Sequence, residues 1–176
     1  IIIAWVEPND NRYPLCIGTA YAQTFRTGGA PISNRVQVSQ SVQNSNGDDV
    51  SGFLRVNSVA YENGRYAVVW DDFQHTYAAN LELNGNIATP HRQLLPGEVP
   101  KIGGNSAEQH YVVLSEELTG LCTLGGRIAF NADPDPNATF IAGTCGLDSD
   151  IEFLPNGEML LVRTLPNDNV ITGRTV

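Results

Sequence analysis

Apolar residues in this chain either alternate with polar residues or form short runs, and Gly, Asn, Asp and Pro separate these segments. Both patterns are typical of short β-strands, and we find no convincing helix. One apolar segment occurs four times, as IIIAWVE, YAVVWDD, YVVLSEE and MLLVRT. Its matching positions are Trp5, Trp70, Ser115 and Arg163, which lie 65, 45 and 48 residues apart. A repeat of this length, carried by short strands, predicts the blades of a β-propeller or a related array.

The second repeat shows the expected blade most clearly. Its strands are predicted at residues 58–61, 66–72, 77–83 and 87–95. The pair Asn63-Gly64 separates the first two strands, and this pair favours a tight hairpin turn with positive φ. The third repeat fits the same template. Its strands are predicted at residues 102–106, 111–115, 127–130 and 139–142. Four antiparallel strands joined by short turns make one propeller blade.

The first and fourth repeats are truncated. The first repeat begins at the position of a second strand, and its strands are predicted at residues 1–6, 19–25 and 35–39. The fourth repeat ends after a third strand, and its strands are predicted at residues 150–154, 159–163 and 170–176. Unpaired strand edges expose backbone hydrogen-bonding groups. We therefore expect other protein chains, or further parts of the same polypeptide, to cover these edges.

The predicted fold class is all-β: a β-propeller of about four blade-like repeats, alone or as part of a larger propeller. The repeats cover approximately residues 1–40, 53–97, 98–146 and 147–176. A polar insertion at residues 40–52 follows the first repeat. It is interpreted as a surface loop, with a binding loop on a rigid scaffold as the alternative.

The chain is acidic, with 19 Asp and Glu against 10 Lys and Arg and a net charge of -9. Such a surface argues against nucleic acid and anionic membranes as partners. Only 16% of the residues are charged, and Gly, Asn, Thr, Ser and Pro replace them, which favours a β-rich protein that is secreted, periplasmic or at the cell surface. No apolar run is long enough for a membrane-spanning helix, so membrane insertion is not expected. The chain begins without Met and is expected to be processed or part of a longer protein.

The three cysteines suggest one disulfide. Cys122 and Cys145 lie in turn-like segments of one repeat, and we predict a bond between them. The alternative is that both are small buried apolar residues. Cys16 is then free or bonded to a partner. Asn137 begins an Asn-Ala-Thr glycosylation sequon, which matters only in a eukaryotic secretory host.

The segment of residues 131–137 places carboxylate and amide oxygens at alternate positions, as a calcium-binding loop does. Asp133 and Asp135 are therefore candidate calcium ligands, and no other cofactor is expected. The segment lacks the Gly and the distal Glu of an EF-hand. The alternative is a turn between two strands that Pro134 and Pro136 stiffen.

Paired acids follow two of the repeated strands. Asp71 and Asp72 follow the strand of the second repeat, and Glu116 and Glu117 follow that of the third. Together they could bind a cation or a sugar at one rim of the fold. The alternative, which we favour, is that they accept hydrogen bonds in turns at the strand ends, because the first repeat contributes only Glu7 and the fourth no acid.

No catalytic motif is present: there is no GxSxG, HExxH or P-loop pattern. His75, His91 and His110 do not have the spacing of metal ligands, and we expect them to be exposed or hydrogen-bonded structural residues. Ser115 replaces Trp in the repeat, but no His or Asp partner can be identified for it as a nucleophile. No catalytic residue is therefore predicted.

The second repeat resembles a repeat that is common in large secreted and surface proteins of bacteria. The residues that carry the resemblance are Val59-Ala60, Asn63-Gly64, Tyr66, Val68-Val69-Trp70, Asp72, Tyr77-Ala78 and Asn84-Gly85. The first repeat keeps Trp5, Tyr21-Ala22-Gln23 and Gly28-Gly29. The third and fourth repeats keep the apolar strand and the small residues Gly126 and Gly173, each followed by Arg. The resemblance implies an extracellular or cell-envelope propeller and brings no catalytic residue, since that family is mostly without assigned activity.

These features favour a non-enzymatic propeller module that contacts protein or glycan within a larger assembly. One alternative is a propeller enzyme acting on polysaccharide, which requires acids that converge on the central channel. The other is a structural subunit of a surface filament or complex, joined to its neighbours through open blade edges.

Overall fold

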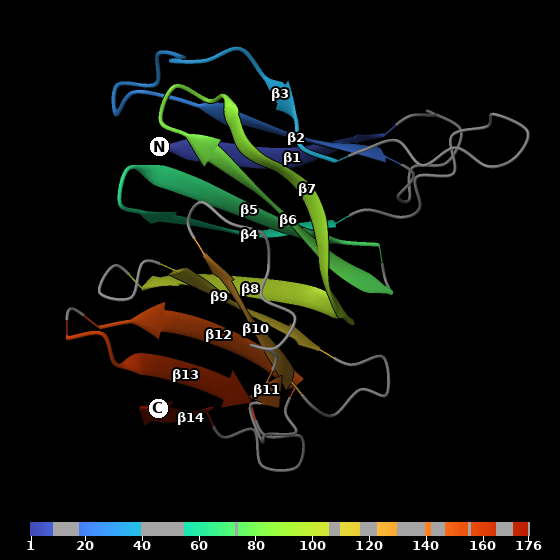
Figure 1. Ribbon diagram of the computed structural model, residues 1–176, viewed down its shortest axis with the longest axis vertical. Coiled ribbons are helices and arrows are strands. Elements are labelled where there is room, and N and C mark those ends of the chain that lie inside the picture. The colour runs from blue at the N-terminus through green and yellow to red at the C-terminus, as the bar shows by residue number, and fades with distance from the viewer. Residues whose placement is uncertain are drawn as a thin grey trace, which may run out of the picture.

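The computed structural model describes residues 1–8, 18–39, 55–72, 74–105, 110–116, 123–129, 140–141, 147–154, 156–164 and 171–175. These residues form fourteen β-strands in four antiparallel sheets, with no helix among them that could cross a membrane. The sheets follow one another in chain order along the longest axis, and the two termini lie on the sheets at opposite ends (Figure 1). Each sheet corresponds to one of the four predicted repeats.

The two middle sheets have four strands each, in up-and-down order. The second sheet consists of β4 (Arg55–Glu62), β5 (Arg65–Asp71), β6 (His75–Glu82) and β7 (Ile87–Pro96). The third consists of β8 (Glu98–Asn105), β9 (His110–Glu116), β10 (Thr123–Ala129) and β11 (Phe140–Ile141). All eight predicted strands are confirmed. β4 and β8 begin earlier than predicted because their first residues are polar and hydrogen-bonded, which an apolar pattern does not mark.

The two end sheets have three strands each in the described residues, as predicted. The first consists of β1 (Ile2–Pro8), β2 (Gly18–Thr24) and β3 (Val36–Gln37). The fourth consists of β12 (Leu147–Phe153), β13 (Met159–Thr164) and β14 (Ile171–Thr175). Trp5 of β1 pairs with Tyr21 of β2 just as Trp70 of β5 pairs with Tyr77 of β6. β1 therefore corresponds to β5, the second strand of a complete sheet.

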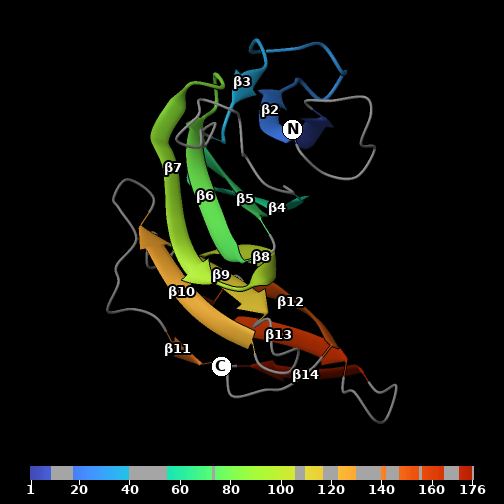
Figure 2. The same ribbon diagram turned by 90° about the vertical axis from the view of Figure 1, so that its right-hand side faces the viewer.

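The first strands of successive sheets lie next to one another. β4 contacts β8, and β8 contacts β12, while β1 contacts β4 at the end of the series. Figure 2 shows the sheets as successive layers from the N-terminal to the C-terminal end. This stacking of sheets through neighbouring first strands is the arrangement that propeller blades have.

Each junction between neighbouring sheets has its own apolar cluster. The first and second sheets bury Ala20, Ala22, Val38, Tyr66, Val68, Trp70, Ala79 and Leu81. The second and third bury Ala67, Val69, Ala78, Leu95, Ile102, Tyr111 and Val113. The third and fourth bury Val112, Leu114, Ile151, Met159 and Leu161. Successive residues of β5 and β9 thus enter different clusters. Because both faces of these strands are covered, their sequences are continuously apolar.

A small residue lies at the same register position of every sheet. Ala22, Ala78, Gly125 and Gly173 are each paired with the residue that precedes the repeat's Trp5, Trp70, Ser115 or Arg163 position. The predicted match between Gly126 and Gly173 is wrong by one residue, because Gly125 occupies the register position of Gly173. Two adjacent glycines give a sequence pattern no means of choosing between them, whereas strand pairing fixes the register.

The predicted hairpin between β4 and β5 is also confirmed. Asn63 and Gly64 have φ values of 48° and 79°. Two consecutive residues of positive φ form the turn that matches the twist of the strands that it joins, and Asn-Gly is the pair that adopts it most readily. The local sequence thus determines the register of these two strands.

Candidate functional site

The side of the first sheet that points away from the second carries exposed apolar residues. Ile2, Ala4 and Val6 of β1 pack toward the second sheet. Because side chains alternate along a strand, the residues between them lie on the opposite side. Ile1 and Ile3 are 58% and 51% exposed. This opposite side also carries Trp5, Tyr21 and Arg35, and we call the five residues Ile1, Ile3, Trp5, Tyr21 and Arg35 the front face.

Aromatic and charged groups of the front face hold one another in place. The rings of Trp5 and Tyr21 stack with their centroids 6.1 Å apart. The guanidinium of Arg35 lies over the Tyr21 ring, 4.7 Å from its centroid, and donates to both carboxylate oxygens of Glu7 at 2.5 and 2.6 Å. The Trp5 indole N–H donates to Glu7 at 3.1 Å. The indole, phenol and guanidinium are thus pre-ordered as one surface.

The second sheet repeats this arrangement at equivalent positions. Trp70 and Tyr77 stack with centroids 6.1 Å apart. The centroid of the His91 ring lies 5.4 Å from that of Trp70 and 4.7 Å from that of Tyr77. His91 thus takes the place that Arg35 has in the first sheet. The Tyr77 hydroxyl donates to Asp72 at 2.7 Å, and Asp72 is the counterpart of Glu7.

The strand register supports this equivalence. Tyr21 pairs with Gln37, and Tyr77 pairs with Gln93. Arg35 and His91 each stand two residues before that Gln, fourteen residues after the Tyr. His91 lies in the fourth strand of its sheet, as predicted. The constellation around His91 is not among the predicted sites, although the equal spacing is visible in the sequence.

The two arrangements differ in whether another sheet covers them. Trp70 and Val68 are fully buried against Ala20 and Ala22 of the first sheet. The counterpart of Val68 on β1 is Ile3, which is 51% exposed. Among the described residues, no sheet covers the front face, whereas a neighbouring sheet covers the equivalent surface one repeat later.

The acids of both arrangements are stabilised in their charged form. At Glu7 the hydrogen bond from the Trp5 indole is the largest influence and lowers its pKa; burial opposes this, and the hydrogen bond and charge of Arg35 lower the pKa further. At Asp72 burial acts to raise the pKa. The hydrogen bonds from the Tyr77 hydroxyl and the backbone N–H groups of His75 and Gln74 outweigh burial, so the pKa is lowered.

The aromatic side of the covered arrangement favours neutral groups. Burial lowers the pKa of His91, and the charge of Arg92 lowers it further against the opposing charge of Asp72. Burial and the bond to Asp72 raise the pKa of Tyr77. His91 and Tyr77 are thus a neutral pair beside a carboxylate.

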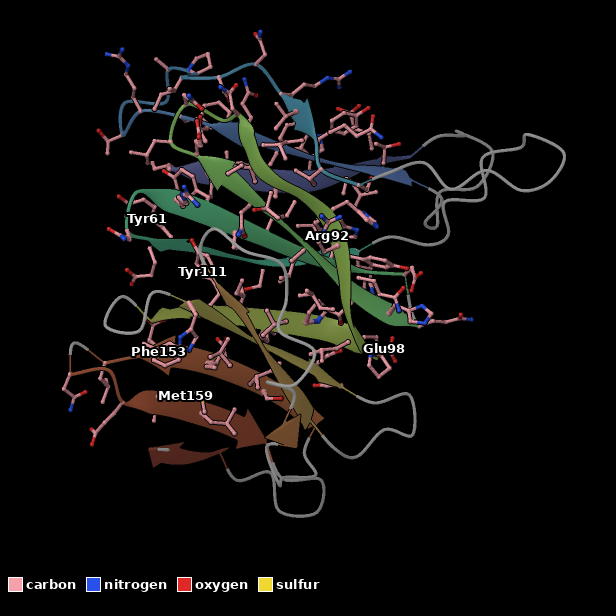
Figure 3. All side chains as sticks on the ribbon, in the orientation of Figure 1. Tyr61, Arg92, Glu98, Tyr111, Phe153 and Met159 are labelled. Atoms are coloured by element: carbon pink, nitrogen blue, oxygen red, sulfur yellow. The ribbon has the colours of Figure 1, made fainter. Side chains whose placement is uncertain are left out.

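A second polar cluster joins the second and third sheets. The carboxylate of Asp71, fully buried, accepts from Arg55 Nη2 at 2.9 Å and from the backbone N–H of Val99 at 3.2 Å. The same Nη2 donates to Glu98 at 2.5 Å, and Figure 3 shows Glu98 where β7 passes into β8. Burial alone would lower the pKa of Arg55, but its bonds to Asp71 and Glu98 raise it. This cluster fixes β4, β5 and β8 to one another.

A groove of about 390 Å³ lies along the first strands of the second to fourth sheets. It is lined by Ser58, Val59, Ile102, Asp150, Ile151, Glu152, Leu160 and Val162. Asp150 and Glu152 are exposed members of one strand, β12. The groove therefore carries two carboxylates, both on β12, among residues that are mostly apolar.

The predicted turn acids and histidines have structural partners. The carboxylate of Asp72 accepts hydrogen bonds from backbone N–H groups of its own turn, as predicted. The Nδ1 atom of His75 lies 3.7 Å from Asp72 Oδ1. His110 is 8% exposed and contacts the Phe153 ring edge-on. Ser115 Oγ contacts Thr76 Oγ1, at 2.7 Å. Asp71 and Asp72 are engaged separately, and the predicted rim of acids stays a prediction because Glu117 lies outside the described residues.

Other predicted sites lie outside the described residues. They are Cys16, Cys122, Cys145, Asp133, Asp135, Asn137, Glu117 and the insertion of residues 40–52. The predicted disulfide, calcium ligands and glycosylation site therefore stay predictions. Within the described ranges no group of three or more His, Cys, Asp or Glu could hold a metal ion.

No protein-family model matches the chain, and no curated protein matches it. Among solved structures it is similar to TolB from Acinetobacter baumannii, with a TM-score of 0.52 and 11% identity over 97% of this chain and 40% of the TolB chain. It is also similar to an engineered GH43 glycoside hydrolase with endo-xylanase and exo-arabinofuranosidase activity, with a TM-score of 0.43 and 11% identity over 99% of this chain and 38% of the hydrolase. The second likeness is too low to support an inference.

The likeness to TolB concerns the fold. At 11% identity it places this chain in the all-β class, as a set of β-propeller blades, which is the fold class predicted from the repeat. The chain spans less than half the length of the TolB chain that it matches.

Proposed function

We propose that this chain is a non-enzymatic propeller module that makes protein contacts within a larger assembly through its front face. The observation that carries this proposal is the exposure of Ile3, at 51%, where the equivalent Val68 is fully buried by a neighbouring sheet. Trp, Tyr and Arg are the residues that most often dominate the binding energy of protein interfaces, and the front face has one of each. Their mutual contacts reduce the entropy that binding must remove.

A protein partner fits the front face better than a glycan. Ile1 and Ile3 extend the aromatic pair into an apolar surface, and apolar surface of this kind is covered by protein at the other junctions of the molecule. Glu7 and Arg35 are hydrogen-bonded to each other at the edge of the front face, as polar groups at the rim of an interface often are. We infer a location where such an assembly forms, either secreted, periplasmic or at the cell surface.

Site-specific cross-linking tests this function. A photo-reactive amino acid replaces Ile3 in one variant and Leu83 in a control, since Leu83 is 48% exposed in a turn of the second sheet. Both are incubated with an extract of the source organism's surface fraction. We expect a defined protein adduct at position 3 and none at position 83. Equal labelling of both positions, or no adduct at position 3, would contradict the proposal.

A polysaccharide-acting enzyme is the second candidate, and the groove is the observation that favours it. Asp150 and Glu152 are two residues apart on β12, so their Cα atoms are about 6.5 Å apart along the strand. Carboxyl groups of glycosidases are separated by about 5–9.5 Å. Release of reducing sugar from a panel of plant and bacterial polysaccharides, abolished by Asp150→Asn and Glu152→Gln, would favour this candidate. We expect no release.

A further inference from the structure

We propose that the front face binds the fourth sheet of a second copy of this chain, so that two copies join head to tail. This inference rests on the proposed function and specifies its partner. The chain has both halves of a junction that it forms internally three times.

The first half of this junction is the side of a sheet that faces the preceding one. In the second, third and fourth sheets this side presents Val68, Val113 and Leu161, all buried. They occupy one register position, two residues before Trp70, Ser115 and Arg163. The front face presents Ile3 at that position, exposed. All four sheets therefore have an apolar residue at this register position. Among the described residues, only the first sheet has no preceding sheet to cover it.

The second half is the side of a sheet that faces the following one. Ala67 and Val69 of the second sheet pack there against the third sheet, and Val112 and Leu114 of the third pack against the fourth. The equivalents in the fourth sheet are Leu160 and Val162, which line the groove. We call Leu160 and Val162 the back face.

The back face also has the small residue of the other junctions. Gly173 pairs with Val162, and its counterparts Ala22 and Ala78 are buried beneath the following sheet. A small residue at this position leaves room for the large side chains of the next sheet, as Ala22 does for Trp70. The back face thus has the apolar and small residues that the other junctions have, and Asp150 and Glu152 of β12 lie beside it on the same side of the sheet.

Two copies can satisfy both faces at once. A head-to-tail contact uses different surfaces on its two partners, and it closes only if the rotation between them is right. One chain has four sheets, so two chains together have twice that number. That total lies within the range of about four to eight blades that closed propellers have. In the closed pair each Trp5 is covered as Trp70 is now.

Sedimentation velocity with matched variants tests the pairing. The wild-type chain is expected to sediment with twice its mass of 19.0 kDa. Ile3→Asp places a charge on the front face, Leu160→Asp and Val162→Asp place one on the back face, and Leu83→Asp is the control. Each front-face or back-face variant is expected to dissociate at least about tenfold more readily, and the control to remain paired. Circular dichroism checks that each variant is folded.

A mixture of variants tests the head-to-tail geometry. Ile3→Asp retains an intact back face, and Leu160→Asp retains an intact front face, so an equimolar mixture is expected to form pairs that neither forms alone. A pair dissociated by Ile3→Asp but unaffected by both back-face variants would be symmetric and would overturn the inference. A monomeric wild-type chain would overturn it as well.

Acrylamide quenching then separates this inference from the proposed function. Trp70 is fully buried, so quenching reports on Trp5. A monomer with quenchable Trp5 leaves the front face free for a different protein, and the proposed function stands without the second copy. A monomer with shielded Trp5 contradicts both.

Discussion

Thr76 Oγ1 and Ser115 Oγ lie 2.7 Å apart across the junction of the second and third sheets, where both side chains are buried. The backbone of Gly97 passes beside them. Gly97 has a φ of 108°, and a Cβ there would lie 2.7 Å from Ser115 Oγ and 2.1 Å from the Glu116 carbonyl oxygen. The connection from β7 to β8 therefore fills space that the side chains of Trp5 and Trp70 take in their own sheets.

Replacing Ser115 is expected to destabilise the fold. Ser115→Ala leaves the buried hydroxyl of Thr76 with the Gly97 carbonyl at 3.3 Å as its contact, at a cost of about 1–2 kcal/mol. Ser115→Trp restores the residue of the repeat but meets Gly97, and overpacking of this kind costs about 1–3 kcal/mol or more. Urea denaturation gives both values. If Ser115→Trp left the free energy of unfolding unchanged, the space beside Ser115 would not be filled by the backbone at Gly97.

The buried Asp71 is expected to depend on Arg55. Arg55→Met leaves the carboxylate without its cation, and losing one partner of such a pair costs about 3–5 kcal/mol. The control is Arg35→Met, which breaks the pair with Glu7. Because those side chains are 55% and 39% exposed, water screens this pair and the loss is expected to be much smaller. Equal losses in chemical denaturation would contradict this assignment.

The stability of the fold is expected to decrease over two separate pH ranges as the pH is lowered. The pKa of His91 is lowered from its ordinary value of 6.5. Its contribution to stability is therefore complete above pH 6.5 and is lost as the pH falls through the lower pKa of the folded state. The pKa of Asp72 is lowered from its ordinary value of 3.8, so a second loss of stability follows as the pH falls below that value. His91→Gln should remove the first loss and Asp72→Asn the second. Thermal unfolding from pH 7 to low pH measures both, and unchanged profiles would refute the coupling.

The two tryptophans are expected to contribute unequally. Trp70→Ala empties a fully buried site and should cost about 3–5 kcal/mol. Trp5→Ala removes a ring from the front face and should cost roughly 1 kcal/mol at a protein concentration low enough to keep the chain unassociated, since mainly its stacking on Tyr21 is lost. Denaturant midpoints at two protein concentrations measure the difference. A large cost for Trp5→Ala at the lower concentration would mean that another part of the chain covers it.

The order and pairing of the strands could be predicted from the sequence because Trp5 and Trp70 mark one position in two repeats, and apolar runs mark it in the other two. The Asn63-Gly64 turn added the register of one hairpin. The roles of Arg35 and His91 could have been found from their equal distance to Tyr21 and Tyr77. The partner of Ser115 could not have been found from the sequence, because the contact depends on the backbone path at Gly97, which has no counterpart in the other repeats.

The small residue at Ala22, Ala78, Gly125 and Gly173 gives the array a direction. In each junction, large side chains of one sheet point toward the sheet that precedes it in the chain, and the small residue of that preceding sheet leaves room for them. The two sides of a sheet are therefore different, and the sheets can stack in one orientation only. A duplicated second sheet, inserted after the original in the same orientation, would meet matching surfaces on both sides. Chains of this kind could therefore lengthen by tandem duplication without redesigning any contact.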